Sequence, residues 1–128
     1  MGEKLKRGQK AIQQSRLRAV GNQYSDRDYE VNISLPEFTC LCPISGYPDF
    51  ATIHVKYIPD KHIVELKSLK LYINKYRDQS VFHEEVVNRI LDDLVALVRP
   101  RWMEVTGDFN PRGNVKTVVT ARYEKEKH

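Results

Sequence analysis

Two cysteines and an aspartate lie close together in a part of the sequence that is rich in turn-forming residues. Cys40 and Cys42 belong to the segment FTCLCP at 38–43, and Asp49 follows Cys42 by seven residues. A thiol with a carboxyl group nearby can perform covalent catalysis, because the carboxyl group can move the proton that the thiol must lose. Alternatively, the cysteines are small buried hydrophobic residues and Asp49 is a turn residue after Pro48. Spacing alone leaves both interpretations open.

The two cysteines are poor candidates for a disulfide or a metal site. Side chains two residues apart on an extended strand are held apart, so a bond between Cys40 and Cys42 would be strained. With His54 and His83 they offer sulfur and nitrogen donors, but C-x-x-C and H-x-x-x-H spacings are missing and no ligand set can be named. We therefore expect no metal, and free thiols in a reducing, cytoplasmic compartment.

A histidine and a glutamate open the second predicted helix. At about 100° per residue, His83 falls near the middle of the apolar arc from Phe82 to Leu91, and Glu84 falls at its edge. His83 alone is typical of a core histidine with a satisfied hydrogen bond. A carboxylate at the inner border needs a partner, and a ligand with several N–H donors, such as a purine, would provide one.

Positive charges for a phosphate-bearing cofactor are less distinctive. The sequence has neither G-x-G-x-x-G nor a Walker loop, so a dinucleotide would bind outside those frameworks. Lys67 and Lys70 are three residues apart on a predicted helix, so they share a face that could meet phosphates. An ordinary solvated helix face explains these two lysines equally well.

Four stretches alternate apolar and polar side chains and are predicted as strands. They span residues 29–35, 51–57, 103–109 and 115–123. Pro36 is expected to end the first strand and Pro59 the second. The last two strands are joined by a turn that contains Asn-Pro-Arg-Gly at 110–113.

Two stretches between the second and third strands have helical periodicity. The first runs from Leu66 to Tyr76, and the second follows Ser80, an N-cap candidate, and ends at Pro100. The order strand, strand, helix, helix, strand, strand, with a polar face on each strand, predicts an α+β fold. We expect an antiparallel four-stranded sheet with both helices packed on one face.

Length and composition indicate one globular domain. The chain has 128 residues, of which 41% are hydrophobic and 30% charged, with six glycines and six prolines; this composition excludes disordered and collagen-like classes. No apolar run approaches the ~18–20 residues of a transmembrane helix, so we expect no membrane partner. A domain of this size has one core and no deep interdomain cleft. We therefore expect another subunit to complete a pocket for a large substrate.

The positive charge is concentrated in the first part of the chain. Lys and Arg number 21 against 17 Asp and Glu, and residues 1–20 hold a net charge of +5 while the remainder holds −1. The chain is accordingly divided into a basic N-terminal arm, 1–24, and a single domain, 25–128. The arm lacks the apolar segment and cleavage site of a secretory signal. A nucleic-acid reader more often carries its positive charge on the folded surface, so no direct nucleic-acid partner is expected.

Four segments resemble the NADPH-dependent 7-cyano-7-deazaguanine reductases, the nitrile reductases of queuosine biosynthesis, which have the tunnelling fold. Residues 37–43 together with 48–51 look like the nucleophile loop of the family, and residues 65–72 look like its cofactor signature. Residues 82–84 look like the segment that anchors the substrate, and residues 109–113 look like the C-terminal turn. The octapeptide ELKSLKLY at 65–72 is highly specific, and the resemblance covers about residues 20 to 124.

The resemblance implies a role for each matching residue. Cys42 matches the nucleophile that adds to the nitrile carbon and forms a covalent thioimide, Asp49 matches the proton donor, and Cys40 matches no required position. The residues that would hold the deazapurine substrate are Val64, Glu65, Leu66, His83 and Glu84. The residues that would meet the phosphates of NADPH are Lys67, Lys70 and Arg112. Asn114 stands where the family often has a second glycine.

The resemblance also implies a ring-forming homo-oligomer with sites at subunit boundaries, in which the sheets join into a barrel. Hydrides from two successive NADPH molecules would convert the nitrile to 7-aminomethyl-7-deazaguanine. Two other functions stay open: an amidinotransferase-type relative of archaeosine formation, which adds ammonia to the same thioimide, and a non-catalytic module that binds purines or tRNA. A zinc-dependent cyclohydrolase of the same fold is disfavoured, because its metal ligands cannot be found.

Overall fold

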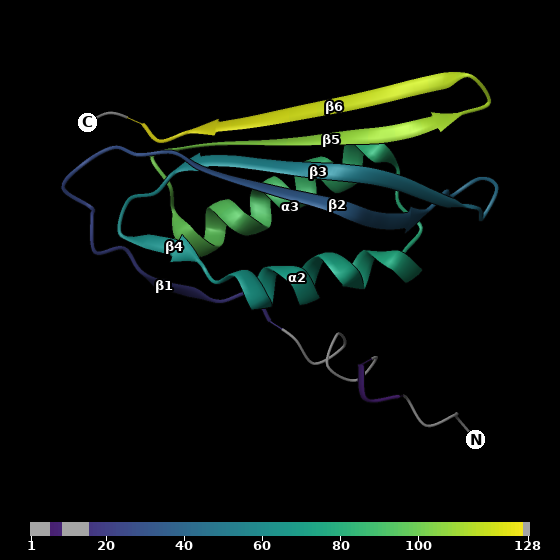
Figure 1. Cartoon of the computed structure of the whole chain (residues 1–128). Helices are drawn as coiled ribbons and strands as arrows, with labels where there is room; N and C mark the ends of the chain where they lie inside the picture. Colours follow the sequence, from purple (N-terminus) through teal and green to yellow (C-terminus); the bar gives the residue numbers. More distant parts are fainter. Residues whose placement is uncertain (1–5, 9–15, 127–128) are drawn as a thin grey trace.

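A four-stranded antiparallel sheet with two helices on one face forms the body of the protein (Figure 1). The structure is a computed structural model that describes residues 6–8 and 16–126. The sheet order is β2-β3-β5-β6, and these strands are β2 (Val31–Leu41), β3 (Pro48–Ile58), β5 (Trp102–Arg112) and β6 (Val115–Glu124). The α+β class and the two helices are confirmed.

A second, two-stranded sheet was not predicted. β1 (Ala19–Gly21) pairs antiparallel with β4 (His62–Val64), just before α2 (Leu66–Asn74) begins. Three residues are too few to show the alternation that marks a strand, so the prediction of a single sheet was wrong in this respect. The pairing attaches the end of the predicted arm, 1–24, to the domain. Half of that arm, residues 1–5 and 9–15, lies outside the described residues, and its boundary stays a prediction.

β2 passes through Pro36 and changes phase there. Its pairing with β3 shifts register between Leu35 and Phe38, so the expectation that Pro36 ends the strand was wrong. β2 is an edge strand, where a proline at a bulge is tolerated because no ladder hydrogen bond is lost. Before the bulge Leu35 packs against the core, and after it Phe38 and Cys40 are buried.

β3 begins at Pro48, earlier than predicted, and brings an acidic side chain onto the core face. Its buried positions are Asp49, Ala51, Ile53, Val55 and Tyr57. Asp49 is therefore an inward-facing strand residue, paired directly with Cys40 of β2. The interpretation of both residues as parts of a loop was wrong, because the ladder extends beyond the regular apolar alternation.

α2 starts after a carboxylate cap. The side chain of Glu65 accepts hydrogen bonds from the N–H groups of Lys67 at 3.2 Å and Ser68 at 2.7 Å. This arrangement satisfies two donors that have no partner inside the helix. The helix continues into the 3₁₀ helix η1 (Lys75–Asp78), close to the predicted end at Tyr76.

α3 (His83–Val98) begins later than predicted. Its N-cap is Phe82, so the expectation of Ser80 was wrong. Ser80 instead forms a β-bridge with Leu41 at the end of β2. This bridge fixes the start of α3 beside the end of β2.

The apolar stripe of α3 packs closely against β5. Gly107 of β5 allows this approach, because a Cβ there would lie 2.6 Å from Val87 Cγ2 and 2.8 Å from Phe109 Cε2.

Among residues 6–8 and 16–126, no helix is long and apolar enough to cross a membrane.

We expect Gly107→Ala to lower the free energy of unfolding by about 1–3 kcal/mol, because the added methyl group overlaps a packed core. The measurement is urea unfolding at one fixed protein concentration, followed by circular dichroism. Gly21→Ala is the matched control, because a Cβ at Gly21 meets nothing within 4 Å, and its effect should stay within about 0.5 kcal/mol. Equal effects of the two substitutions would contradict the close approach of α3 to β5.

Candidate functional site

The ends of five elements meet at one end of the sheet and surround an open hollow of about 320 Å³. The end of β2, the start of β3, the start of α3, the end of β5 and the start of β6 all lie there (Figure 1). The lining residues with reactive or charged side chains include Cys42, Ser45, Asp49, His83, Glu84 and Arg112. The structure thus brings together five of the ten residues predicted for the site.

Asp49 is a buried carboxylate with a partner on each oxygen. Its side chain is only 8% exposed. Oδ2 lies 3.1 Å from His83 Nε2, and Oδ1 accepts a hydrogen bond from Arg112 Nη1 at 3.0 Å. Burial of a charged carboxylate requires such partners in place of water. The position of Asp49 is therefore fixed from both sides, by α3 and by β5.

Packing sets the orientation of His83. Its ring stacks on Phe109 at a centroid distance of 3.7 Å and an angle of 6°, which agrees with its predicted place in the apolar arc. The next residue, Glu84, is exposed, so the expectation of a carboxylate that needs a buried partner was wrong. Glu84 nevertheless lines the same hollow, where its carboxylate can accept hydrogen bonds from a ligand.

Cys42 lies one residue beyond the end of β2, in a tight loop. Its N–H donates to the Tyr47 carbonyl at 2.8 Å, and its carbonyl accepts from the Gly46 N–H at 2.9 Å. Hydrogen bonds from the Ser45 hydroxyl first, and then from the N–H groups of Ser45 and Ile44, lower the pKa of the Cys42 thiol. The loop therefore presents a thiol that ionises readily.

Cys40 has the opposite properties. It is fully buried in the core. Burial, and then the negative charge of Asp49, raise the pKa of Cys40 to about 12. Only Cys42 is therefore a good thiolate near neutral pH, and Cys40 fits the interpretation of a small buried hydrophobic residue.

Two neighbours of the reactive groups were missed in the sequence. Ser45 lies in a Pro-x-Ser-Gly turn, from which a hydroxyl contact to the nearby thiol could have been suspected. Phe109, the stacking partner of His83, opens the matched segment 109–113, but its alternation in the strand indicates only a core position and not the contact with His83. The contact of Arg112 with Asp49 was also missed, because 63 positions separate the two residues.

Of the other predicted residues, Val64 to Lys67 lie toward the opposite end of the sheet, whereas Lys70 lies farther along α2 and lines a hollow with residues 35–38 of β2. The N–H of Val64 donates to the Tyr57 hydroxyl at 3.0 Å. Tyr57 and Asp49 are eight positions apart on β3, a distance of roughly 25 Å along a strand. Within one chain, therefore, Glu65 and its neighbours do not reach Cys42.

The region around Glu65 offers an ionised acceptor and exposed side chains. The N–H group of Ser68 makes the largest contribution that lowers the pKa of Glu65. Leu66 is 63% exposed, and Lys67 and Lys70 are also exposed. Neither lysine ammonium group has an ion-pair partner among the residues that the structure describes. This surface can therefore meet an anionic ligand.

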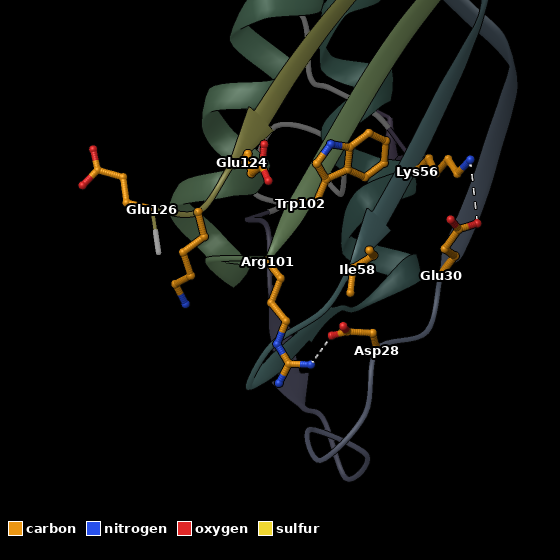
Figure 2. Close-up of a pocket in the computed structure, with 9 residues that line it drawn as sticks. Asp28, Glu30, Lys56, Ile58, Arg101, Trp102, Glu124 and Glu126 are labelled. Carbon is orange, nitrogen blue, oxygen red and sulfur yellow. Dashed lines mark hydrogen bonds and ion pairs between the residues drawn. The ribbon is translucent and has the colours of Figure 1, made fainter. Parts of the chain in front are cut away.

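A larger hollow, of about 600 Å³, lies at the other end of the sheet (Figure 2). Arg101 points to Asp28, with Nη1 and Oδ1 2.7 Å apart, and Lys56 points to Glu30 across 3.7 Å. Trp102 lies between these two ion pairs (Figure 2). The hollow is lined by no thiol or histidine, and its cations Lys56, Arg101 and Lys125 are each paired with a carboxylate, so we assign it no chemistry.

The residues considered as metal ligands do not lie together. His54 is exposed on the open face of the sheet, where its Nδ1 lies 3.2 Å from Ser34 Oγ. Cys42 and His83 line the hollow at the end of the sheet. Within 6–8 and 16–126, no group of three or more His, Cys, Asp or Glu residues could hold a metal ion.

Comparisons with known proteins give a consistent result. A family model described as QueF-like protein matches residues 48–128. The NADPH-dependent 7-cyano-7-deazaguanine reductase of Thermosynechococcus vestitus is 54% identical over 122 residues, 95% of this chain and 92% of the relative. The Aquifex aeolicus protein of the same name is 56% identical over 117 residues, 91% of each chain. A crystal structure of an archaeosine synthase, QueF-Like, in the apo form has a TM-score of 0.70 and 26% identity, covering 77% of this chain and 96% of that one.

We expect Ser45→Ala to slow alkylation of Cys42 by iodoacetamide roughly 3- to 10-fold near neutral pH. Without the Ser45 hydroxyl, the pKa of Cys42 rises toward its usual value. The thiolate fraction at any pH below that value then falls in proportion. The measurement is the labelling rate from about pH 6 to 9, with the labelled site assigned by mass spectrometry.

Cys40 is an internal control in this experiment. Because burial raises the pKa of Cys40 to about 12, it should be labelled only after unfolding. Equal labelling rates of Cys42 in wild type and Ser45→Ala at every pH would contradict the proposed hydrogen bond.

Proposed function

The chain belongs to the QueF-like protein family, and from this membership we propose that it reduces the nitrile of 7-cyano-7-deazaguanine with NADPH, to 7-aminomethyl-7-deazaguanine, in queuosine biosynthesis. One observation carries the proposal: a readily ionised thiol, Cys42, shares a hollow with the buried carboxylate of Asp49. That arrangement occurs in a chain that matches reductases of this name over nearly its whole length.

Cys42 begins the reaction as the nucleophile. A nitrile is a poor hydride acceptor, but addition of the thiolate to its carbon produces a thioimide, whose C=N group can be protonated. A sulfur–carbon bond forms, one π bond of the nitrile breaks, and the thiol proton ends on the nitrogen. Asp49 carries this proton from sulfur to nitrogen.

Lys67, Lys70 and Arg112 are the residues that we assign to the cofactor phosphates. The two lysines are exposed, without an ion-pair partner among the described residues, and share one side of α2; this donor chemistry fits a phosphate-bearing group. When bound, NADPH supplies hydride, and two molecules in succession provide the four electrons that the amine requires. The attachment to Cys42 retains the substrate between the two reductions.

Carboxylates and a histidine are suited to hold the deazaguanine. Its ring edge presents several N–H donors, for which Glu84 and Glu65 are acceptors. We assign His83 to the same ring from the side of the thiol, with Val64 and Leu66 as flanking contacts. The exposure of Glu84 and the ionised state of Glu65 support these assignments.

We assign the complete site to a boundary between subunits of a homo-oligomer. The distance of Glu65 from the Cys42 hollow supports this: Val64 contacts Tyr57, which lies roughly 25 Å along β3 from Asp49, and neither group of residues completes the site alone. β2 and β6 are the two edges of the sheet, and their free backbone groups are available for pairing with other copies. A ring of the tunnelling type would join such edges. A cytoplasmic location and the absence of a nucleic-acid partner stay predictions.

An amidinotransferase activity is the second candidate function. It would add ammonia, instead of hydride, to the same thioimide. The structural likeness to an archaeosine synthase favours it. The reductase is preferred because the proteins of that name are 54% and 56% identical to this chain, against 26% for the synthase.

We expect wild-type protein to gain the mass of one substrate when mixed with 7-cyano-7-deazaguanine without cofactor, and Cys42→Ala to gain none. Cys40→Ala is the matched control and should form the adduct, because Cys40 is buried and protonated. NADPH should discharge the adduct with release of the amine. The measurement is intact-protein mass spectrometry combined with product analysis.

Other outcomes of this experiment would redirect the assignment. An adduct that persists with NADPH but yields to ammonia would identify the amidinotransferase. No adduct on folded, assembled wild type would contradict covalent catalysis and favour a purine-binding module.

We expect Cys42→Ala and Glu65→Gln, each nearly inactive alone, to recover about a quarter of wild-type turnover when co-assembled in equal amounts. With random mixing, about half of the sites have an intact Cys42, and about half of these face a neighbour with an intact Glu65. The measurement is NADPH oxidation by mixed oligomers prepared by joint refolding or co-expression.

The matched control for this experiment is Cys42→Ala mixed with Asp49→Asn. Both residues belong to the same cluster of one chain, so mixing restores no complete site and no activity should return. Failure of the first pair to recover activity, with both variants folded and assembled, would contradict a site shared between subunits.

A further inference from the structure

Arg112 makes contacts inside the site that a cofactor role does not explain. Its Nη1 donates to Asp49 Oδ1 at 3.0 Å and to the Pro48 carbonyl at 2.7 Å. Its guanidinium carbon also lies 5.4 Å from the centroid of the Tyr47 ring. Three successive residues, 47–49, thus hold this arginine against the start of β3. Contacts with cofactor phosphates would require none of these.

The end of β5 is shaped to bring Arg112 to this place. The pairing of β5 with β6 shifts register between Phe109 and Arg112, and Gly113 and Asn114 follow with φ of 55° and 70°. A bulge turns a side chain away from the regular strand direction, and two left-handed residues make a tight hairpin turn. Asparagine tolerates this conformation better than most residues, which explains Asn114 at a position where glycine is expected.

Arg112 is the permanent positive charge beside Asp49. The titratable groups that face this carboxylate or line its hollow are those of Cys40, Cys42, His83, Glu84 and Arg112. The thiols and Glu84 contribute no positive charge, and His83 contributes one only when protonated. Among the residues that the structure describes, Arg112 alone keeps a cation within hydrogen-bond distance of Asp49 at every working pH.

We propose that Arg112 is a positioning residue for the covalent step, in which it holds the Asp49 carboxylate in place before any cofactor binds. This inference rests on the proposed function. In this step the Cys42 proton passes to Asp49, sulfur bonds to the nitrile carbon, and Asp49 returns the proton to the nitrile nitrogen. The step consumes no oxidant or reductant. It can therefore be observed without NADPH, under conditions in which a contact with cofactor phosphates has no effect.

The test is the rate of adduct formation with 7-cyano-7-deazaguanine in the absence of NADPH, measured by intact mass. We expect Arg112→Gln to react at least ~10-fold more slowly than wild type, because its neutral side chain no longer holds the Asp49 carboxylate in place.

Two further variants separate charge from structure. Arg112→Lys keeps a cationic donor beside Asp49, so it should form the adduct faster than Arg112→Gln, a rescue that a purely structural role would not give. Arg122→Gln is the matched control: Arg122 pairs with Glu104 at 2.6 Å on β6 and β5, away from the hollow. It should react at the wild-type rate.

Several results would overturn the inference while leaving the proposed function intact. One is an Arg112→Gln variant that forms the adduct at the wild-type rate and has a changed KM for NADPH alone, which would confine Arg112 to the cofactor. Another is an Arg112→Lys variant as slow as Arg112→Gln, which would indicate a purely structural role. Adduct formation by Arg112→Lys as slow as that by Asp49→Asn would also overturn it, and this comparison decides even if Arg112→Gln does not fold. Absence of any adduct on wild type would instead overturn the proposed function and this inference with it.

Discussion

The buried carboxylate of Asp49 is the constraint on which the arrangement of this end of the molecule depends. A carboxylate on the core face of a strand is destabilising unless donors replace the water that it loses. These donors come from distant parts of the chain, since His83 follows Asp49 by 34 positions and Arg112 by 63. α3 must therefore begin beside the sheet, where its first residue stacks on Phe109, and β5 must bulge at its end. The need of Asp49 for these donors thus determines where α3 starts and how β5 ends.

The same end of the sheet gives two cysteines opposite chemical properties. The bulge at Pro36 shifts the phase of β2, so that Cys40 faces the core and pairs with Asp49. In that position, burial and the neighbouring carboxylate raise the pKa of Cys40 to about 12. Cys42 has left the ladder, and hydrogen bonds led by the Ser45 hydroxyl lower the pKa of its thiol. The reactivity of each thiol is therefore determined by whether its cysteine lies within β2 or beyond the end of that strand.

Long elements could be predicted from the sequence, and short or interrupted ones could not. A strand or helix of seven or more residues shows its period, which is why the α+β class was correct. The three-residue strands β1 and β4, and the bulge at Pro36, depend on partners that are distant in the chain. The site followed the same rule. The spacing of Cys42 and Asp49 made them candidates and the family resemblance predicted their roles, whereas the burial of Asp49 and its bond to Arg112 require the three-dimensional pairing of strands.

The division of the predicted site between two ends of one sheet has a consequence for the proposed chemistry. A nitrile takes up four electrons on its way to an amine, so two cofactor molecules must bind and leave in turn while the same substrate waits. A hollow of about 320 Å³, open at the end of the sheet, allows this exchange more readily than a closed cavity would. Such openness would normally release a small substrate as well. The proposed bond to Cys42 would remove that difficulty, because the substrate could not dissociate until reduction freed it. In this proposal, covalent catalysis and a site assembled between small subunits are two parts of one solution for a chain too short to enclose both ligands.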